Sequence, residues 1–459
     1  MVIERKFTDL EWLMTPEPVR RQFVQLEQIV NDLTKRIEKL EVQVGMNSKN
    51  SSKPPSSDSP YKKVRRKKQD KKKKRAKGAK KGHKGHQQQL LEPTDKNHLL
   101  PGQCSCGHQG FSRCETTPFY THQHVELPVI DMEITHWILH KCDCPVCGKT
   151  VKASLPENIH GGYGPRLCAF IAELSGTKGM SRRDVQQLIQ SVLNIPIATG
   201  TIQKIVDRSS EAILPVYEMI GNQARRSWCN YVDETSWFNH NELQWLWAMV
   251  NERVALYRVD AHRSKKAFEE LVQDWQGILI SDSYNLYRSW VYGRQTCLAH
   301  LIRKGDALAE RKKRDLRLFG QCMASHLRQL VRFSKDPPDS VQWSEFYTYL
   351  MFTLSLWEGD KTDAGQLARQ VQREMDALWT FLDHEGIEPT NNRAERALRS
   401  GVLWRKRSLG TQSEKGKRWV ERVLSLKETC RLRATSTFAV FEDCLRSYFN
   451  NSKPDLSWI

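Results

Sequence analysis

Two aspartates lie at positions where local structure alone does not require a carboxylate. Asp233 lies within the apolar segment Trp228 to Trp237, and Asp282 follows the apolar segment Gly277 to Ile280. A buried carboxylate is unstable unless hydrogen bonds or a cation compensate it. Each residue is therefore a candidate metal ligand, although either one alone is as well explained as a cap of the turn that follows its strand.

A third carboxylate, Glu395, strengthens the metal interpretation. Pro389 to Arg399 predicts a helix that begins at a Thr/Asn cap, Thr390 and Asn391, with Glu395 one turn inside it. Its alternative role is a surface salt bridge, with Arg399 four residues further on. Three carboxylates suit Mg²⁺ or Mn²⁺, and two such ions about 3.5–4 Å apart stabilise the entering and leaving oxygens of an in-line displacement.

The segments around the two aspartates indicate how the chain brings them together. Trp228 to Trp237, Leu243 to Val250 and Val254 to Val259 predict three antiparallel strands. Ser264 to Trp275 has the spacing of an amphipathic helix, and Gly277 to Ile280 predicts a buried strand. Strand, strand, strand, helix, strand is the order of the ribonuclease-H-like fold, in which the two aspartates would lie side by side.

Composition and charge define the class of partner. The 459 residues are 39% apolar, with 14 Trp and 15 Phe, which is enough for two or three domains. The net charge is +19, and Lys62 to Lys84 holds 15 Lys or Arg against one acid, Asp70. No run of about 18 apolar residues is present to span a membrane, and no signal peptide opens the chain. We expect a soluble, cytoplasmic, nucleoid-associated protein that binds DNA.

The N-terminal 95 residues divide into a helix and a linker. Apolar residues recur at alternating steps of three and four, which predicts a helical seam over residues 1–46; they are Phe23, Leu26, Val30, Leu33, Ile37, Leu40 and Val44. This seam pairs with a second copy in a coiled coil or packs on the body of the protein. Residues 47–95 are typical of a disordered basic linker that contacts phosphates regardless of sequence. The alternative for the linker is a solvated tail that serves solubility.

Residues 96–160 contain two short cysteine pairs, each followed by glycine. The candidate ligands are Cys104, Cys106, Cys144 and Cys147. Four thiolates on two such turns can close a tetrahedral Zn²⁺ site, so we expect a structural, zinc-ribbon-like domain. The first pair is Cys-x-Cys rather than Cys-x-x-Cys, which leaves His108, Cys114 or Cys142 as alternative ligands and leaves loss of the metal open.

Residues 161–222 predict two helices separated by a break at Pro196. Ser181 can cap the first helix and Thr199 the second. This is the outline of a helix-turn-helix, whose second helix can enter a major groove, but a plain helical hairpin has the same pattern. Arg182 and Arg183 favour a contact with DNA.

Several segments resemble the motifs of one family. Asn391 to Arg399 (NNRAERALR) closely resembles the Glu-bearing motif of the insertion-sequence sixty-six (TnpC-type) transposases, and Val232 to Thr235 and Ser281 to Tyr284 resemble its two Asp motifs. The resemblance runs almost end to end and includes Cys297 to His300 (CLAH) and Trp404 to Arg407 (WRKR). The sequence departs from the family pattern at the first cysteine pair, which bears on zinc binding and not on catalysis.

The resemblance implies a DDE transposase of a bacterial insertion sequence, with Asp233, Asp282 and Glu395 as metal ligands. The expected fold class is multidomain α/β: a ribonuclease-H-like catalytic domain over residues 223–430, with a helical insertion at about 303–385 and a helical tail at 431–459. Such an enzyme binds element ends and target DNA and catalyses strand cleavage and transfer. We also expect a homo-oligomer and companion proteins from the same element.

Basic residues surround Glu395 in the sequence. They would repel a second cation unless phosphates intervened, so we interpret them as contacts to the DNA backbone; with the two arginines of the helical region they are Arg182, Arg183, Arg393, Arg396, Arg399, Arg405, Lys406 and Arg407. Cys297 and His300 have a spacing that can bind metal. Without two further ligands nearby, we interpret them as packing residues that support the active-site strand.

Three other functions fit parts of the sequence. A non-catalytic regulator derived from a transposase would keep the fold and the basic linker. A metal-dependent nuclease without joining activity would share every site residue. A zinc-ribbon scaffold that binds RNA would leave the three carboxylates without a role, and alanine at any of them would then change nothing.

Overall fold

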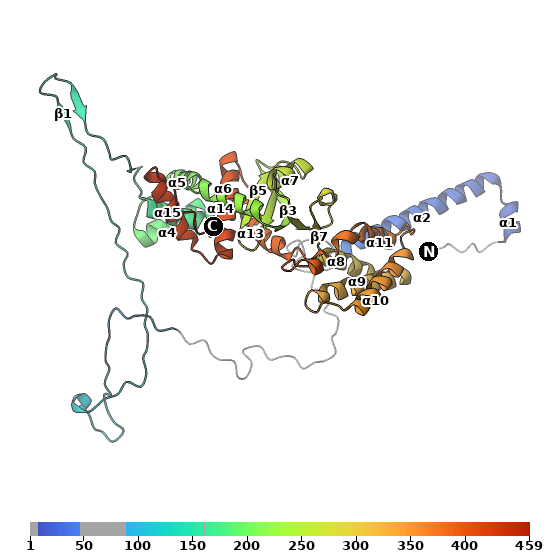
Figure 1. The fold of residues 1–459 in the computed structure, drawn as a ribbon, viewed down its shortest axis with the longest axis horizontal. Coiled ribbons are helices and arrows are strands. Elements are labelled where there is room, and N and C mark those ends of the chain that lie inside the picture. Colours follow the sequence, from blue (N-terminus) through green and yellow to red (C-terminus); the bar gives the residue numbers. More distant parts are fainter. Residues whose placement is uncertain (1–7, 46–88, 160) are drawn as a thin grey trace. The chain divides into compact units, whose positions relative to one another are not determined.

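The computed structural model describes residues 8–45, 89–159 and 161–459 (Figure 1). The chain separates into two compact units, residues 1–60 with 136–459, and residues 61–135. The Lys-rich run of the predicted linker lies outside the described residues. None of the helices in the described part of the chain is long and apolar enough to cross a membrane.

The predicted N-terminal seam lies on one long helix. After α1 (Asp9–Met14), α2 covers Glu17–Gly45. The seam side chains from Phe23 to Leu40 are exposed to solvent, with 57% of Leu26 and 50% of Leu33 accessible. Over most of its described length, the seam therefore packs against no other part of the chain that the structure describes.

A five-stranded mixed sheet forms the centre of the larger unit, in the order β5-β4-β3-β6-β7. The strands are β3 (Cys229–Asn239), β4 (Glu242–Val250), β5 (Ala255–Asp260), β6 (Ile278–Ser281) and β7 (Arg294–Thr296). The three-strand meander and the fourth strand predicted from the apolar runs are confirmed. His240 and Asn241 both have positive φ, so β3 and β4 are joined by a tight two-residue turn.

Helices cover both faces of this sheet. In β4, Leu246 and Ala248 pack in one core with residues of α13 (Asn392–Ser408) and α14 (Glu414–Leu432). Trp247, which points to the opposite face because strand side chains alternate, contacts Phe268 of α7 (Lys265–Val272) with ring centroids 6.5 Å apart. α13 and α14 therefore lie on one face, and α7 lies on the other.

Side chains of α14 cover the free edge of β5. The backbone N–H groups of Ala255, Tyr257 and Val259 donate to Thr429 Oγ1 (3.1 Å), Ser425 Oγ (2.9 Å) and Glu421 Oε1 (2.7 Å). Four helical residues rise about 6 Å, and two strand residues advance about 6.8 Å. Because these two distances nearly match, side chains four residues apart on α14 can accept hydrogen bonds from N–H groups two residues apart on β5.

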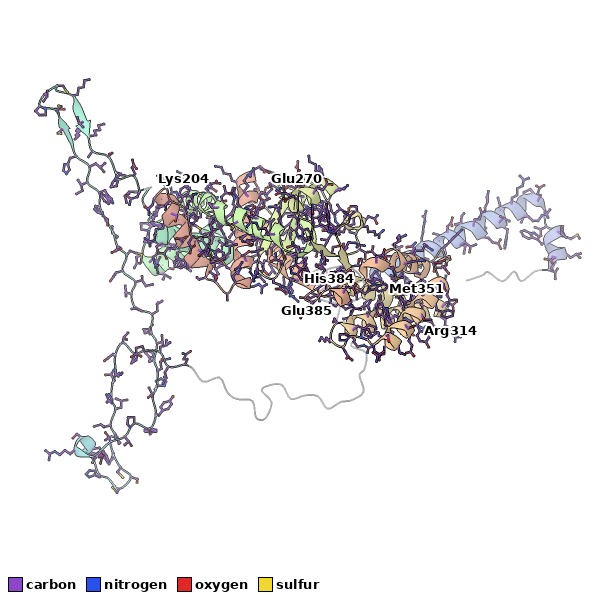
Figure 2. The ribbon with its side chains drawn as sticks, in the orientation of Figure 1. Lys204, Glu270, Arg314, Met351, His384 and Glu385 are labelled. Carbon is purple, nitrogen blue, oxygen red and sulfur yellow. The ribbon has the colours of Figure 1, made fainter. Side chains whose placement is uncertain are left out.

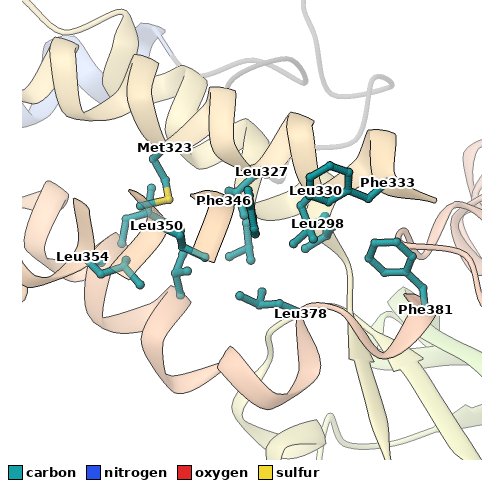
Figure 3. Close-up of a cluster of buried hydrophobic side chains, with 14 of the residues drawn as sticks. Leu298, Met323, Leu327, Leu330, Phe333, Phe346, Leu350, Leu354, Leu378 and Phe381 are labelled. Carbon is teal, nitrogen blue, oxygen red and sulfur yellow. The ribbon is translucent and has the colours of Figure 1, made fainter. Parts of the chain in front are cut away.

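Five helices and a short 3₁₀ segment separate β7 from α13. They are α8 (Leu298–Ala309), α9 (Arg314–Phe333), α10 (Ser340–Ser355), α11 (Asp363–Arg373), η5 (Met375–Ala377) and α12 (Thr380–Asp383), and the predicted insertion at 303–385 falls within them. Figure 2 labels Arg314 of α9, Met351 of α10, and His384 and Glu385, which lead from α12 toward α13. Figure 3 shows their buried core, in which Leu298, Leu327 and Phe346 face one another. The same core includes Tyr231 and Ile280 of the sheet.

The remaining helices precede the sheet or end the chain. They are α3 (Pro165–Ala172), the π-helical η3 (Glu173–Thr177), α4 (Arg182–Leu193), α5 (Thr199–Ala212), α6 (Leu214–Arg226) and α15 (Thr437–Phe449). Ser181 caps α4 in a capping box with Asp184, as predicted. The prediction for α5 was wrong by one residue, because Ala198 is the N-cap and Thr199 is already helical.

Candidate active site

The first two candidate ligands come from neighbouring parallel strands. The last paired residues of β3 and β6 are Tyr231 and Ile280. Asp233 and Asp282 each stand two residues beyond this pair, so continuing the register puts them side by side. The N–H group of Tyr284 donates to Asp282 Oδ1 at 2.9 Å, so Asp282 also caps the turn after its strand.

Strand alternation explains which side of the sheet Asp233 faces. Its neighbours at two-residue spacing are Tyr231, whose ring lies 5.1 Å below the Arg393 guanidinium, and Thr235, whose hydroxyl accepts from Arg405 at 3.3 Å. Both arginines belong to α13. Asp233 therefore faces the helix that carries Glu395.

Asn391 ties the start of α13 to β3. This buried residue donates from Nδ2 to the carbonyl oxygen of Val232 at 2.8 Å, and its backbone N–H donates to Cys297 Sγ at 3.1 Å. Asn391 occupies the N-cap position, which confirms where the helix was predicted to begin, but its side chain makes no capping hydrogen bond. The Asn391 side-chain amide instead binds Val232, the residue before Asp233. This hydrogen bond fixes the position of Glu395, which lies four residues after Asn391, relative to β3.

The carboxylates are close enough to perturb one another. Burial raises the pKa of Asp233 well above its ordinary value, and the negative charges of Glu234, Asp282 and Glu395 raise that pKa further. One hydrogen bond opposes them, from the Glu234 N–H to Asp233 Oδ1 at 2.9 Å. A carboxylate in this setting lacks countercharge, which a divalent cation supplies.

Glu395 has partners that sequence spacing did not predict. Its Oε1 lies 3.6 Å from His300 Nε2, and its Oε2 lies 3.5 Å from the Arg303 guanidinium. The surface salt bridge to Arg399 considered from sequence is absent among the ion pairs of the described residues. Glu395 Oε1 is buried and has no hydrogen-bond partner there.

Glu234 forms a second buried acidic site on the opposite face of the strand. Its side chain is 1% exposed, pairs with Arg263 and accepts a hydrogen bond from the Tyr287 hydroxyl. Burial raises the pKa of Glu234, and the Arg263 charge lowers it. Sequence inspection missed this group because both of its partners follow later in the chain, 29 and 53 residues away.

A basic pocket opens directly after Asp282. The cavity of about 460 Å³ begins at Ser283 and is lined by Arg288, Lys304, Arg369 and Arg373. Arg288 is paired with Glu374 at 2.7 Å. Arg373 is exposed and has no acidic partner in the described part of the chain. The pocket was not predicted, because it arises where α11 of the helical segment meets the loop that follows β6.

The basic residues predicted to contact DNA divide into two groups. Four make contacts within the chain: Arg182 with Gln203, Arg393 with Glu388, Arg405 with Ser236, and Arg407 with the carbonyl of Lys178. The side chains of Arg183, Arg396, Arg399 and Lys406 are exposed. Arg407 of the first group is exposed as well, and Lys406 of the second group also interacts within the chain.

The two cysteine pairs belong to different units, Cys104 and Cys106 to residues 61–135 and Cys144 and Cys147 to residues 136–459. A four-cysteine zinc site therefore stays a prediction. In each pair the N–H group of the following glycine donates to the carbonyl of the first cysteine at 2.8 Å. Backbone hydrogen bonds within each turn lower the pKa of Cys104 and of Cys144.

Comparison with known families fits this arrangement. The model of the transposase IS66 family matches residues 160–418, a range that contains all three candidate carboxylates. The chain belongs to the transposase IS66 family. A family of unknown function (DUF6444) matches residues 15–89, and no curated protein matches. The resemblance recognised from the sequence is thereby confirmed, and membership of a transposase family implies action on DNA.

Proposed function

We propose that this IS66-family chain cleaves and joins DNA at the ends of a bacterial insertion sequence, with Asp233, Asp282 and Glu395 as ligands of Mg²⁺ or Mn²⁺. The observation that carries the proposal is the convergence of these three carboxylates: the β3–β6 register puts Asp233 beside Asp282, and the Asn391 hydrogen bond to Val232 holds the helix of Glu395 against β3. A ribonuclease-H-like core is part of the proposal, supported by the mixed sheet order β5-β4-β3-β6-β7.

The donor set fits a hard divalent cation. The raised pKa of Asp233 and the absence of a hydrogen-bond partner for Glu395 Oε1 among the described residues are both expected of ligands that need a positive partner. When bound, the metal pair would activate the attacking oxygen and stabilise the leaving oxygen. Asn391 keeps the third ligand in place, and Arg303 restrains the other oxygen of Glu395.

The basic pocket supports a path for DNA beside the carboxylates. Its lining begins at Ser283, one residue after Asp282, and includes the cationic side chains of Arg288 and Lys304, so a phosphate held there would adjoin the reacting group. We include Arg183, Arg396, Arg399 and Lys406 in this contact surface because their charges are exposed. Such contacts position the DNA and carry no base specificity of their own.

Other parts of the proposal concern assembly. The exposed seam of α2 supports a homo-oligomer formed through a coiled coil, and the cysteine turns support a structural Zn²⁺ site. We retain residues 161–222 as a helix-turn-helix-like DNA-binding region, the nucleoid as the place of action, and companion proteins of the same element as partners.

The deciding experiment compares Asp233→Asn with Asp274→Asn on DNA that carries the inverted repeats flanking the coding region. Asp274 is an exposed acid after α7, outside the site. We expect Asp233→Asn to abolish cleavage and strand transfer while DNA binding survives, and Asp274→Asn to retain both. Cleavage by Asp233→Asn would refute the assignment. Wild-type cleavage without joining would favour the nuclease, and DNA binding without cleavage would favour the regulator.

A further inference from the structure

A second group of potential metal ligands adjoins the carboxylates. Cys297, His300 and Glu395 each offer one donor atom, and these atoms lie within 4.8 Å of one another. Cys297 is buried, whereas 15% of the His300 side chain and 30% of the Glu395 side chain are accessible. The group is therefore partly accessible to solvent, and it shares Glu395 with the candidate active site.

The N-terminal ends of two helices bring Cys297 and Glu395 close together. Cys297 is the N-cap of α8, and Glu395 lies in the first turn of α13. The N–H of Leu298 donates to the carbonyl of Pro389 at 3.0 Å, and the N–H of Asn391 donates to Cys297 Sγ at 3.1 Å. These two bonds join the helices at their N-termini, so the backbone segments that carry Cys297 and Glu395 are held together.

The donors are incompletely satisfied and differ in kind from the triad. Glu395 Oε1 is buried without a hydrogen-bond partner among the described residues. Sulfur and imidazole favour Zn²⁺ and related thiophilic cations, whereas Mg²⁺ prefers oxygen. Tetrahedral Zn²⁺ with bonds of about 2.0–2.3 Å needs donors roughly 3.3–3.8 Å apart. The separation of His300 Nε2 from Glu395 Oε1, 3.6 Å, already meets this requirement.

We propose that Cys297, His300 and Glu395 bind a thiophilic divalent cation of the Zn²⁺ class, with the fourth position left to water. The Cys297 thiol loses its proton to solvent as its sulfur binds the metal. Because Glu395 is shared, occupation of this site withdraws the third carboxylate from Asp233 and Asp282. A thiophilic cation therefore inhibits the enzyme; this consequence, unlike the binding itself, rests on the proposed function.

Co²⁺ is the probe for binding, because thiolate coordination gives it a charge-transfer absorption that oxygen ligands do not. The full-length protein is titrated with Co²⁺, and wild type is compared with Cys297→Ser and Cys168→Ser. Cys168 is the matched control, a buried cysteine of α3 whose Sγ lies 3.5 Å from the Tyr163 carbonyl. The cysteine pairs at residues 104–147 are unchanged in all three proteins, so they contribute the same background.

We expect Cys297→Ser to lose one equivalent of thiolate-bound Co²⁺ and Cys168→Ser to lose none. His300→Gln, which keeps every cysteine, should weaken binding of that equivalent at least tenfold and serves as the test if Cys297→Ser fails to fold. Equal stoichiometry and equal affinity in all the proteins would overturn the site.

The inhibition has a separate test. At fixed Mg²⁺, micromolar Zn²⁺ should suppress DNA cleavage by wild type, and Cys297→Ser should need at least tenfold more Zn²⁺ for the same suppression. Equal sensitivity of the two proteins, with the Co²⁺ site present, would overturn the shared role of Glu395. A protein that binds Co²⁺ as expected but never cleaves DNA would refute the proposed function and leave the binding site standing.

Discussion

Replacing Asn391 by alanine tests whether one buried amide holds the three carboxylates together. The side chain is fully buried, and its Nδ2 donates to the Val232 carbonyl at 2.8 Å. Removing a donor that serves a buried carbonyl lowers the free energy of unfolding by about 1–3 kcal/mol. Asn392→Ala is the matched control, because this half-buried neighbour makes no side-chain hydrogen bond in the described part of the chain.

Activity should fall further than stability explains. A displacement of about 1 Å at a reacting group lowers a rate about 10²-fold, and Glu395 depends on Asn391 for its position relative to β3. We therefore expect Asn391→Ala to cleave DNA about 100-fold more slowly and to need more Mg²⁺ for half-maximal rate, with DNA affinity unchanged.

The assay follows cleavage of end-labelled DNA across a Mg²⁺ titration, beside urea denaturation monitored by tryptophan fluorescence. The reasoning is refuted if Asn391→Ala and Asn392→Ala show the same cleavage rate, the same Mg²⁺ dependence and the same stability.

Four further predictions follow from the described contacts. Without divalent metal, Asp233→Asn should melt at a higher temperature than wild type at neutral pH. The folded pKa of Asp233 is raised, so the wild type loses stability as the pH rises from about 4 toward that pKa. The difference in melting temperature should therefore shrink on acidification. Tyr287→Phe should lower the free energy of unfolding by about 1.5–3 kcal/mol, because Glu234 loses a hydrogen bond to a charged group. Leu33→Lys on the exposed seam should weaken self-association measured by sedimentation. Arg373→Ala should weaken DNA binding for all sequences and reduce the slope of log affinity against log salt by about 1.

Matched substitutions separate these effects from general damage. Tyr349→Phe, at an exposed tyrosine of α10, should leave stability unchanged. Gln28→Lys lies on α2 off the seam and should leave self-association unchanged. Arg332→Ala removes an exposed charge at the end of α9 and should leave the salt slope unchanged. An Asp233→Asn protein that melts lower than wild type without metal would contradict the electrostatic account.

Much of the central sheet could be predicted because its signals are local. Apolar runs of strand length indicate β3 to β6, and an aspartate at the end of such a run stands out against its neighbours. The pairing of Asp233 with Asp282 followed from the expected order of strands. Glu395 was noticed locally, one turn inside a capped helix, but its assignment to the same site needed the resemblance to a family, since 112 residues separate it from Asp282.

The remaining features depend on long-range packing that no local pattern encodes. An asparagine before a helix predicts a side-chain cap, yet the Asn391 amide donates to β3 because the helix start is buried against the strand. Cys297 and His300 lacked a further ligand in the sequence near them. Glu395 reaches them only because the start of α13 meets the start of α8.

The three bonds from α14 to β5 bear on what an incomplete copy of this chain would do. A polypeptide that ends before Glu414 still contains all three carboxylates but lacks α14. The edge strand β5 then has three backbone N–H groups without the α14 side chains that accept their hydrogen bonds. Unpaired strand edges recruit other strands. We therefore expect a frameshift or premature stop in that region to produce an aggregating fragment, which would leave solution instead of acting as a shortened competitor.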